Sequence, residues 1–216
     1  MDTTLGQKAA ALARALVTSP RDLPGWLAQL PAWGRSPADL ELPWWSYGAI
    51  RAFAAFLQPA HRVFEYGSGG SSFFTARRAA TVLAVENDPV WQGLVTGFAR
   101  ERGLANLACE LHPLADDSLA TFRASSFSQR ILADTWDVVI IDCLCGFQAS
   151  RYGVIRPAAF ADALPRVNPG GLIVLDDSWM YPELLVPRPG WDIRDFVGTG
   201  PCRYGVTSTA LLRRVS

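Results

Sequence analysis

The sequence lacks a surplus of charge of either sign. Its 216 residues carry 20 basic and 20 acidic side chains, so the formal net charge is zero. A protein that holds nucleic acid through its phosphates concentrates positive charge on one surface. We therefore expect a small-molecule or glycan-like partner and no nucleic acid.

Long apolar runs and abundant cysteines are missing as well. No stretch reaches the ~18 uninterrupted apolar residues that a membrane span needs, so no membrane association is expected. The four cysteines show no CxxC spacing, which favours ordinary reduced thiols and a cytoplasmic location. The only two histidines, His61 and His112, lie before and inside predicted strands, and we expect structural roles for both.

The residues that are abundant indicate one packed domain. Half of the chain is hydrophobic and it contains eight tryptophans, a composition typical of a globule with a sizeable core. From residue 61 onward, short apolar runs alternate with longer amphipathic stretches, which predicts a parallel sheet with helices on both faces. Residues 1–60 are expected to form a helical cap of the same domain as residues 61–216. The tryptophans of this cap also make a homodimer an option.

The boundaries of the predicted elements follow from these patterns. Parallel strands are expected at 62–66, 81–87, 107–114, 136–144 and 171–177, with a turn at residues 169–171 before the last of them. Helices are expected at 71–80, 89–103, 118–132 and 153–167. Two further strands, 191–198 and 204–214, are predicted to pair antiparallel at one edge of the sheet.

The stretch VFEYGSGGSSFF, residues 63–74, predicts a binding site. A strand ends in Glu65, and Gly67, Gly69 and Gly70 follow at once. Glycines permit positive φ and a close approach of a ligand to the main chain, and the start of the next helix offers free N–H groups. In an open parallel sheet, ligands bind at the carboxyl ends of strands, where this turn is expected to lie.

Two classes of ligand compete for this turn. A dinucleotide favours the spacing GxGxxG, but the third position counted from Gly67 is Ser72. Glu65 would repel a pyrophosphate, whereas it suits the ammonium and sulfonium groups of S-adenosylmethionine. Glu86 ends the second strand, where an acid accepts ribose hydroxyls in either class. S-adenosylmethionine is therefore the favoured ligand, with a nicotinamide-dependent oxidoreductase or a non-catalytic cofactor-binding protein as alternatives.

From about residue 44 to its end, the chain resembles the class I S-adenosylmethionine-dependent methyltransferases. The resemblance is carried by EYGSGG at 65–70, VEND at 85–88, DVVIID at 137–142 and NPGGLIVLDDS at 168–178. It implies a doubly wound α/β fold with a seven-stranded, mostly parallel sheet and an antiparallel strand at the edge. The implied activity is methyl transfer to a small-molecule or glycan-like acceptor, more often at oxygen than at nitrogen or carbon.

The resemblance also implies site residues. Glu65, Gly67 and Gly69 would surround the methionine part of the cofactor, Glu86 would hold the ribose, and Asp116 or its neighbour Asp117 would lie near the adenine. The full set of cofactor-binding residues that we expect is Glu65, Tyr66, Gly67, Ser68, Gly69, Glu86, Asn87, Asp116 and Asp142.

Three carboxylates are predicted to meet at the same edge of the sheet. Asp142 ends the fourth strand, and Asp176 and Asp177 end the fifth. Carboxylates in close proximity repel one another unless a cation or proton intervenes, so one hypothesis is a Mg²⁺ site. That arrangement is similar to the metal-dependent O-methyltransferases, such as catechol O-methyltransferase, although no lysine follows Asp142 here as it does in the catechol enzymes.

Without a metal, Asp142 is the leading candidate for a general base, and Asp176 is the second catalytic candidate. The other interpretation is that Asp142 contacts cofactor or substrate, Asp176 caps a turn and Asp177 is solvated. Aromatic and basic side chains near the predicted site are the candidates for contacts with the acceptor: Trp44, Arg151, Tyr152 and Trp179.

Overall fold

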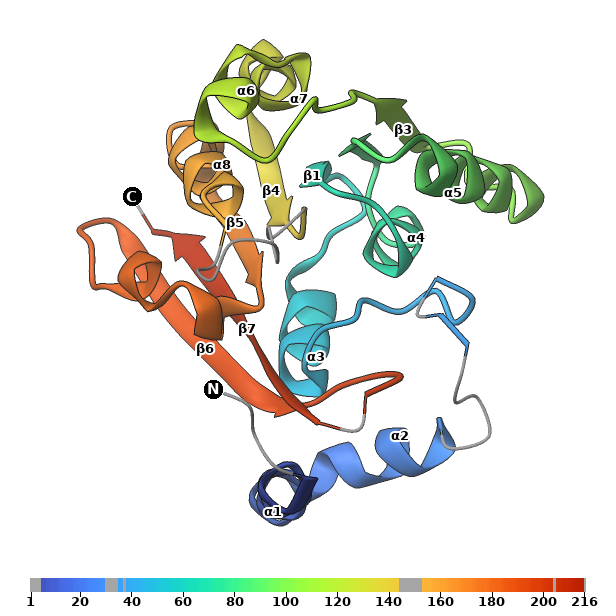
Figure 1. Ribbon diagram of the computed structural model, residues 1–216, viewed down its shortest axis with the longest axis vertical. Helices are drawn as coiled ribbons and strands as arrows, with labels where there is room; N and C mark the ends of the chain where they lie inside the picture. The colour runs from blue at the N-terminus through green and yellow to red at the C-terminus, as the bar shows by residue number, and fades with distance from the viewer. Residues whose placement is uncertain (1–4, 30–34, 37, 144–152, 204, 216) are drawn as a thin grey trace.

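The computed structural model describes residues 5–29, 35–36, 38–143, 153–203 and 205–215. Its centre is a seven-stranded sheet of order β3-β2-β1-β4-β5-β7-β6, with helices on both faces (Figure 1). The predicted doubly wound α/β fold is confirmed.

Five strands run parallel. They are β1 (Arg62–Tyr66), β2 (Thr81–Glu86), β3 (Leu107–Leu111), β4 (Trp136–Ile141) and β5 (Val167–Asp176). Val138, Val139, Ile140 and Ile141 of β4 are all fully buried, because a central parallel strand is covered on both of its faces. The order of the strands changes direction at β1 and β4, so their carboxyl ends border the crevice where ligands bind in open α/β sheets.

The predicted turn at residues 169–171 lies inside β5 and not before it. Trp136 pairs with Val167 while Val138 pairs with Leu172, so residues 168–171 stand opposite Asp137 alone. Gly170 has φ 82° at this irregularity. The glycines therefore break the extended chain as predicted, but the strand pairs with β4 on both sides of the break.

The last two strands form the predicted hairpin. β6 (Trp191–Thr199) and β7 (Val206–Arg214) pair antiparallel, and β7 also pairs antiparallel with β5. β7 therefore lies between β5 and β6, and it runs antiparallel to both of them. Thr199, Val206 and Asp176 consequently lie at the same end of the sheet as the carboxyl ends of β1 and β4.

Helices cover the two faces of the sheet in separate groups (Figure 1). One face packs against α3 (Tyr47–Phe56), α4 (Gly70–Ala76) and α5 (Pro89–Glu101). The other packs against α6 (Leu119–Ala124), α7 (Ser126–Gln129) and α8 (Ile155–Ala163). The single helix expected over 118–132 is broken at Ser125, whose extended backbone and hydroxyl cap begin α7, and a 3₁₀ helix η3 (Arg130–Ala133) completes the segment.

The N-terminal segment lies outside the two helical layers. It contains α1 (Leu5–Thr18), a 3₁₀ turn η1 (Pro20–Asp22) and α2 (Leu23–Ala28), and α1 lies beside the hairpin of β6 and β7 (Figure 1). Short 3₁₀ turns η4 (Ser178–Met180) and η5 (Pro182–Leu185) follow β5. In the part of the chain that the structure describes, no helix is long and apolar enough to cross a membrane.

Candidate active site

The glycine turn after β1 is built against the end of β4. Gly67 has φ 93° and Gly69 has φ 155°, a region of backbone conformation that favours glycine. A Cβ on Gly67 would lie 2.6 Å from the carbonyl oxygen of Asp142. This position therefore requires glycine for two reasons, its backbone conformation and the close approach of β4.

Glu65 lies behind this turn. Its side chain is fully buried, and its carboxylate accepts hydrogen bonds from the hydroxyl of Ser71 and, at 2.7 Å, from that of Ser72. The Ser72 hydroxyl also accepts a bond from the N–H of Gly69 at 3.0 Å. Glu65 thus connects β1 to the first turn of α4 and fixes the shape of the glycine turn, and it is not among the residues that line the adjacent cavity.

Burial raises the pKa of Glu65 to about 8. The two serine hydroxyls oppose this shift, and the negative charges of Asp142 and Glu86 add to it. Near neutral pH the carboxyl is therefore largely protonated. The sequence predicts that the negative charge of Glu65 attracts a sulfonium, whereas its hydrogen bonds in the structure give it a role in holding the turn.

A cavity of about 370 Å³ opens at the carboxyl ends of β1 and β4. One wall is the glycine turn from Ser68 to Ser71, and Asp142 lines the side toward β4. Of the expected residues, this cavity brings together Ser68, Gly69, Asp142 and Trp44. Gly70 and Ser71 of the same turn line it as well. Five further lining residues were not predicted from the sequence, which are Arg35, Ser36, Ala38, Trp91 and Cys202.

Trp91 is the missed residue with the clearest role. It lies in the first turn of α5, and its indole N–H donates to the carbonyl of Ser68 at 2.8 Å. Asp88 places it there by capping α5, because its carboxylate accepts from the N–H groups of Val90 and Trp91. The motif VEND contained this signal, since an aspartate before a proline predicts the start of a helix.

Glu86 lies beside the cavity wall at the end of β2. It is buried, and its carboxylate accepts from the Ser68 hydroxyl at 2.7 Å and from the N–H groups of Asn87 and Asp88 at 2.9 and 3.1 Å. A carboxylate has roughly four acceptor positions, so one remains for a ligand, although Glu86, like Glu65, is not among the residues that line the cavity. Asn87 is half-buried next to it.

Two other expected cofactor contacts lie elsewhere. The side chain of Tyr66 is fully buried in the core, where its hydroxyl donates to the carbonyl of Ser128 at 3.1 Å. Asp116 is exposed and accepts from the N–H of Ser118 at 2.9 Å, ahead of α6. Hydrogen bonds from Ser118 and Thr121 lower the pKa of Asp116. Neither residue lines the cavity, and Asp117 is likewise exposed.

The predicted convergence of three carboxylates is centred on an arginine. Arg156, on α8, is 4% exposed, and its guanidinium donates to Asp142 at 3.1 Å and lies 3.6 Å from Asp177. The same guanidinium donates to the carbonyls of Cys143 at 2.8 Å and Asp176 at 2.7 Å. Negative charge around it raises its pKa despite burial, so Arg156 is a fixed cation at this edge of the sheet.

The carboxylates themselves differ in exposure. Asp176 is 2% exposed, and its carboxylate accepts from the Thr209 hydroxyl at 2.7 Å. Asp142 is 24% exposed and also accepts from the Trp45 indole N–H at 3.4 Å. Burial raises the pKa of both groups, and Arg156 opposes the shift. Asp142 is therefore the acid that faces the cavity, while Asp176 belongs to the core.

This set of residues does not fit a Mg²⁺ ion. A guanidinium already stands between Asp142 and Asp177, and Asp176 is directed toward Thr209. Among the described residues, no group of three or more acidic, histidine or cysteine side chains could hold a metal. The hypothesis of a metal site formed by Asp142, Asp176 and Asp177 is therefore not supported by the donor set.

The expected acceptor contacts are separated in space. Trp44 is 48% exposed and borders the cavity beside β4. Trp179 is 53% exposed and lines a different cavity, beyond Asp177. Arg151 and Tyr152 lie outside the described residues. His61 contacts Gln58, and His112 contacts Glu110 and Ser126. Neither histidine lines either cavity.

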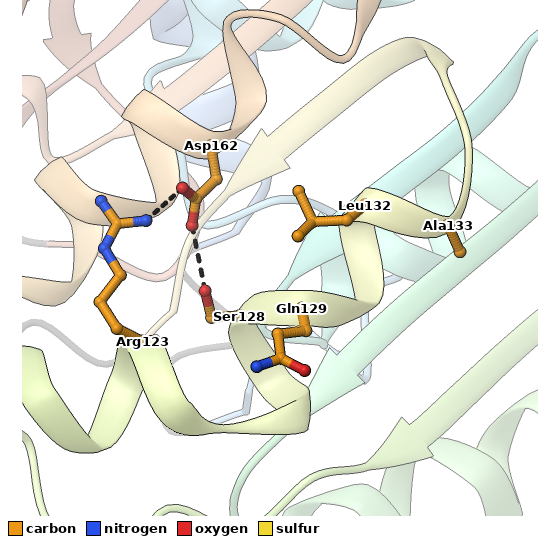
Figure 2. Close-up of a pocket in the computed structure, with 6 residues that line it drawn as sticks. All are labelled: Arg123, Ser128, Gln129, Leu132, Ala133 and Asp162. Atoms are coloured by element: carbon orange, nitrogen blue, oxygen red, sulfur yellow. Dashed lines mark hydrogen bonds and ion pairs between the residues drawn. The ribbon is translucent and has the colours of Figure 1, made fainter.

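A third hollow, of about 540 Å³, lies between α7, η3 and α8 (Figure 2). Its charged groups are paired with one another, because Asp162 forms an ion pair with Arg123 and accepts from the Ser128 hydroxyl at 3.0 Å. The end of η3 directly precedes β4, so this hollow is near the amino ends of the strands. It is not a candidate for the cofactor.

Solved structures of several methyltransferases share this architecture. The O-methyltransferase TomG from Streptomyces achromogenes, involved in tomaymycin synthesis and solved with S-adenosylmethionine, is 18% identical, with a TM-score of 0.56 over 82% of this chain and 85% of that one. An O-methyltransferase from Bacillus cereus, solved with S-adenosylhomocysteine, is 17% identical, with a TM-score of 0.57 over 95% and 90%.

An rRNA methylase from Streptococcus thermophilus is also similar, at 13% identity and a TM-score of 0.53 over 76% of this chain and 92% of that one. No protein-family model and no curated protein matches the sequence. At these identities the likeness concerns the fold and not the acceptor. The chain therefore has the fold of the class I S-adenosylmethionine-dependent methyltransferases.

Proposed function

We propose that this protein is an S-adenosylmethionine-dependent methyltransferase that acts on a hydroxyl group of a small-molecule acceptor. The observation that carries the proposal is the cavity at the ends of β1 and β4, which is lined by the main chain from Ser68 to Ser71 and by a carboxylate, Asp142. In this proposal the cap of residues 1–60 belongs to the same domain, and residues 35, 36, 38 and 44 complete the cavity.

The residues around the cavity suit the parts of this cofactor. Ser68, Gly69 and Gly70 offer main chain to the methionine moiety without large side chains in the way. Glu86, with its remaining acceptor capacity beside Ser68, is placed for the ribose hydroxyls. Trp91, held by its bond to the Ser68 carbonyl, offers an aromatic surface for the adenine.

Methyl transfer forms a bond between the acceptor oxygen and the methyl carbon and breaks the carbon–sulfur bond of the sulfonium. The acceptor proton then needs a base, and Asp142 is the carboxylate that faces the cavity. Its raised pKa favours taking up that proton, and Arg156 stabilises it in the charged form before transfer. The protein otherwise contributes by aligning the two reactants and excluding water.

A small acceptor is favoured over RNA by the balance of 20 basic and 20 acidic residues. The reducing cytoplasm is the location that fits the proposal, and Cys109, Cys143 and Cys202 are free thiols in the described part of the chain.

Calorimetric titration with S-adenosylhomocysteine tests the cofactor. We expect saturable binding to the wild-type protein and a loss of about tenfold for Glu86→Gln, because a hydrogen bond to a charged acceptor contributes roughly 1.5 kcal/mol. The matched control is Glu110→Gln on β3, which removes an acid paired with Arg130 outside the cavity.

The control should bind S-adenosylhomocysteine as the wild type does. Absence of binding at millimolar ligand would remove the proposal, and binding of NADH in its place would favour the oxidoreductase alternative. Equal affinity of the Glu86→Gln and wild-type proteins would show that the ribose does not bind Glu86 at the end of β2.

A further inference from the structure

A cavity of about 710 Å³ lies between α1 and the hairpin of β6 and β7. Figure 1 shows α1 beside the ends of these two strands. The strand ends concerned, around Val197 and Val206, lie at the same end of the sheet as the end of β5. The cavity is thus a neighbour of the cofactor cavity at that end of the sheet, and among the described residues the two cavities share no lining residue.

The walls of this cavity are largely apolar. Ala9, Ala11 and Leu12 of α1 face Val197 and Val206 across it, with Trp179 at one side. Two of these side chains are unusually open to solvent, since Val197 is 65% exposed and Trp179 is 53% exposed. Large exposed apolar side chains gathered around one concave surface indicate a binding site, and an indole face is suited to a flat ring.

The charges at this cavity balance. Lys8 and Asp195 line it with one charge of each sign, and Asp195 accepts a hydrogen bond from the Ser178 hydroxyl at 2.6 Å. This pair does not select an occupant with a net charge. The volume of the cavity falls within the ~300–1,000 Å³ typical of cavities for small molecules.

One end of the cavity reaches the carboxylates of the cofactor site. Asp177 accepts from the Trp179 indole N–H and from the Thr207 hydroxyl, both at 3.3 Å, and both of these residues line the cavity. On its other side Asp177 is 3.6 Å from the Arg156 guanidinium, which contacts Asp142 at 3.1 Å. A chain of polar contacts therefore leads from this cavity to the wall of the cofactor cavity.

Arg203 stands at the same boundary. Its guanidinium is 3.8 Å from the Asp177 carboxylate and lies 4.8 Å from the ring centre of Trp44, which borders the cofactor cavity. Arg156 is held by several hydrogen bonds and is 4% exposed, whereas Arg203 is 21% exposed. Arg203 is the side chain that could move aside to let an acceptor reach the methyl group.

We propose that the cavity between α1 and the hairpin of β6 and β7 binds the methyl acceptor, a flat and mainly apolar molecule whose hydroxyl faces Asp177. This inference rests on the proposed function and names its substrate class. The hydroxyl oxygen takes the methyl group from the sulfonium, its proton passes to a carboxylate of the Asp142 and Asp177 pair, and S-adenosylhomocysteine leaves.

The test uses the whole chain, saturated with S-adenosylhomocysteine, and 2-naphthol as the probe in calorimetric titration. We expect saturable binding of 2-naphthol, with glucose as a polar hydroxyl compound giving no heat. Val197→Asp, which places a charge in the apolar wall, and Ala11→Trp, which fills the cavity from α1, should each weaken 2-naphthol at least tenfold.

The matched control is Val215→Asp, at the other end of β7, where the valine is 61% exposed and outside the cavity. This control should bind 2-naphthol as the wild type does. Binding of S-adenosylhomocysteine is measured separately for every variant and should not change.

If S-adenosylhomocysteine binds and 2-naphthol does not, or if 2-naphthol binds equally to all variants, the acceptor inference is overturned and the proposed function stands. Binding of glucose alone would likewise overturn the apolar class. If S-adenosylhomocysteine itself does not bind, the proposed function fails first.

Discussion

Single residues near the site have roles that depend on what surrounds them more than on their type. Glu65 and Glu86 are both acids at strand ends, yet one is enclosed by serine hydroxyls and the other retains acceptor capacity beside the cavity. Asp142, Asp176 and Asp177 are close in space, yet only Asp142 lines the cavity proposed for the cofactor. A sequence shows the acids at the end of each strand but not which of them is covered.

The buried acid Glu65 should make stability depend on pH. Its pKa is about 8 in the folded protein, against an ordinary value of 4.5. Between these values the folded state keeps a proton that the unfolded state releases, so the free energy of unfolding falls as pH rises through this window, by up to roughly 5 kcal/mol.

Glu65→Gln keeps the shape of the side chain and removes the titration. Urea unfolding of both proteins at pH 5, 6, 7, 8 and 9 should therefore show the wild type losing stability relative to the variant as pH increases. A constant difference between the two proteins over this range would contradict the assignment.

The internal cation Arg156 should be essential for stability. Arg156→Met removes a buried partner of Asp142 and Asp177 and leaves carbonyls without their donor, a loss of about 3–5 kcal/mol. The control Arg194→Met removes an exposed ion pair with Asp192 and should have little effect. Thermal unfolding distinguishes them.

Because Arg156 supplies the positive charge, the methyl transfer that we propose for the wild-type protein should not change when EDTA is added. An activity that is lost with EDTA and restored by Mg²⁺ would show that a metal acts in spite of the guanidinium.

At the scale of elements, the sequence predicted the strands and the hairpin because apolar runs and turn residues determine them locally. The prediction of boundaries failed where pairing with a neighbouring strand sets the extent of a strand. In β5 the hydrogen-bonded ladder with β4 is interrupted and then continues. The sequence predictions also missed the second half of the cofactor cavity. Arg35, Ala38 and Cys202 come from segments far apart in the chain, and no local pattern marks their meeting.

The glycine turn after β1 should tolerate no side chain at Gly67. Gly67→Ala would place a Cβ 2.6 Å from the Asp142 carbonyl oxygen at φ 93°, which we expect to cost at least about 2 kcal/mol. Gly97→Ala, in the middle of α5 where a Cβ meets nothing within 4 Å, should instead stabilise by about 0.5–1 kcal/mol.

Chemical denaturation of the two alanine variants measures this contrast. A Gly67→Ala protein as stable as the wild type would mean that β4 can move away from the turn, and the fixed geometry argued for the cofactor wall would then be wrong.

At the scale of the molecule, the fold could be predicted because strand–helix alternation, the glycine turn and the final hairpin all indicate the same architecture. The acceptor cavity that we propose could be predicted only at Trp179, because its other walls depend on α1 meeting strands near the other end of the chain. The neutral total charge limits the class of partner but does not say where that partner binds.

The packing of α1 on β6 and β7 has a consequence for biosynthesis. This helix leaves the ribosome well before the strands it packs against are translated. Its apolar side therefore stays exposed to solvent while the intervening chain folds. A nascent chain stalled before β6 would display that side to chaperones, and the last cavity to form in the cell would be the one we assign to the acceptor.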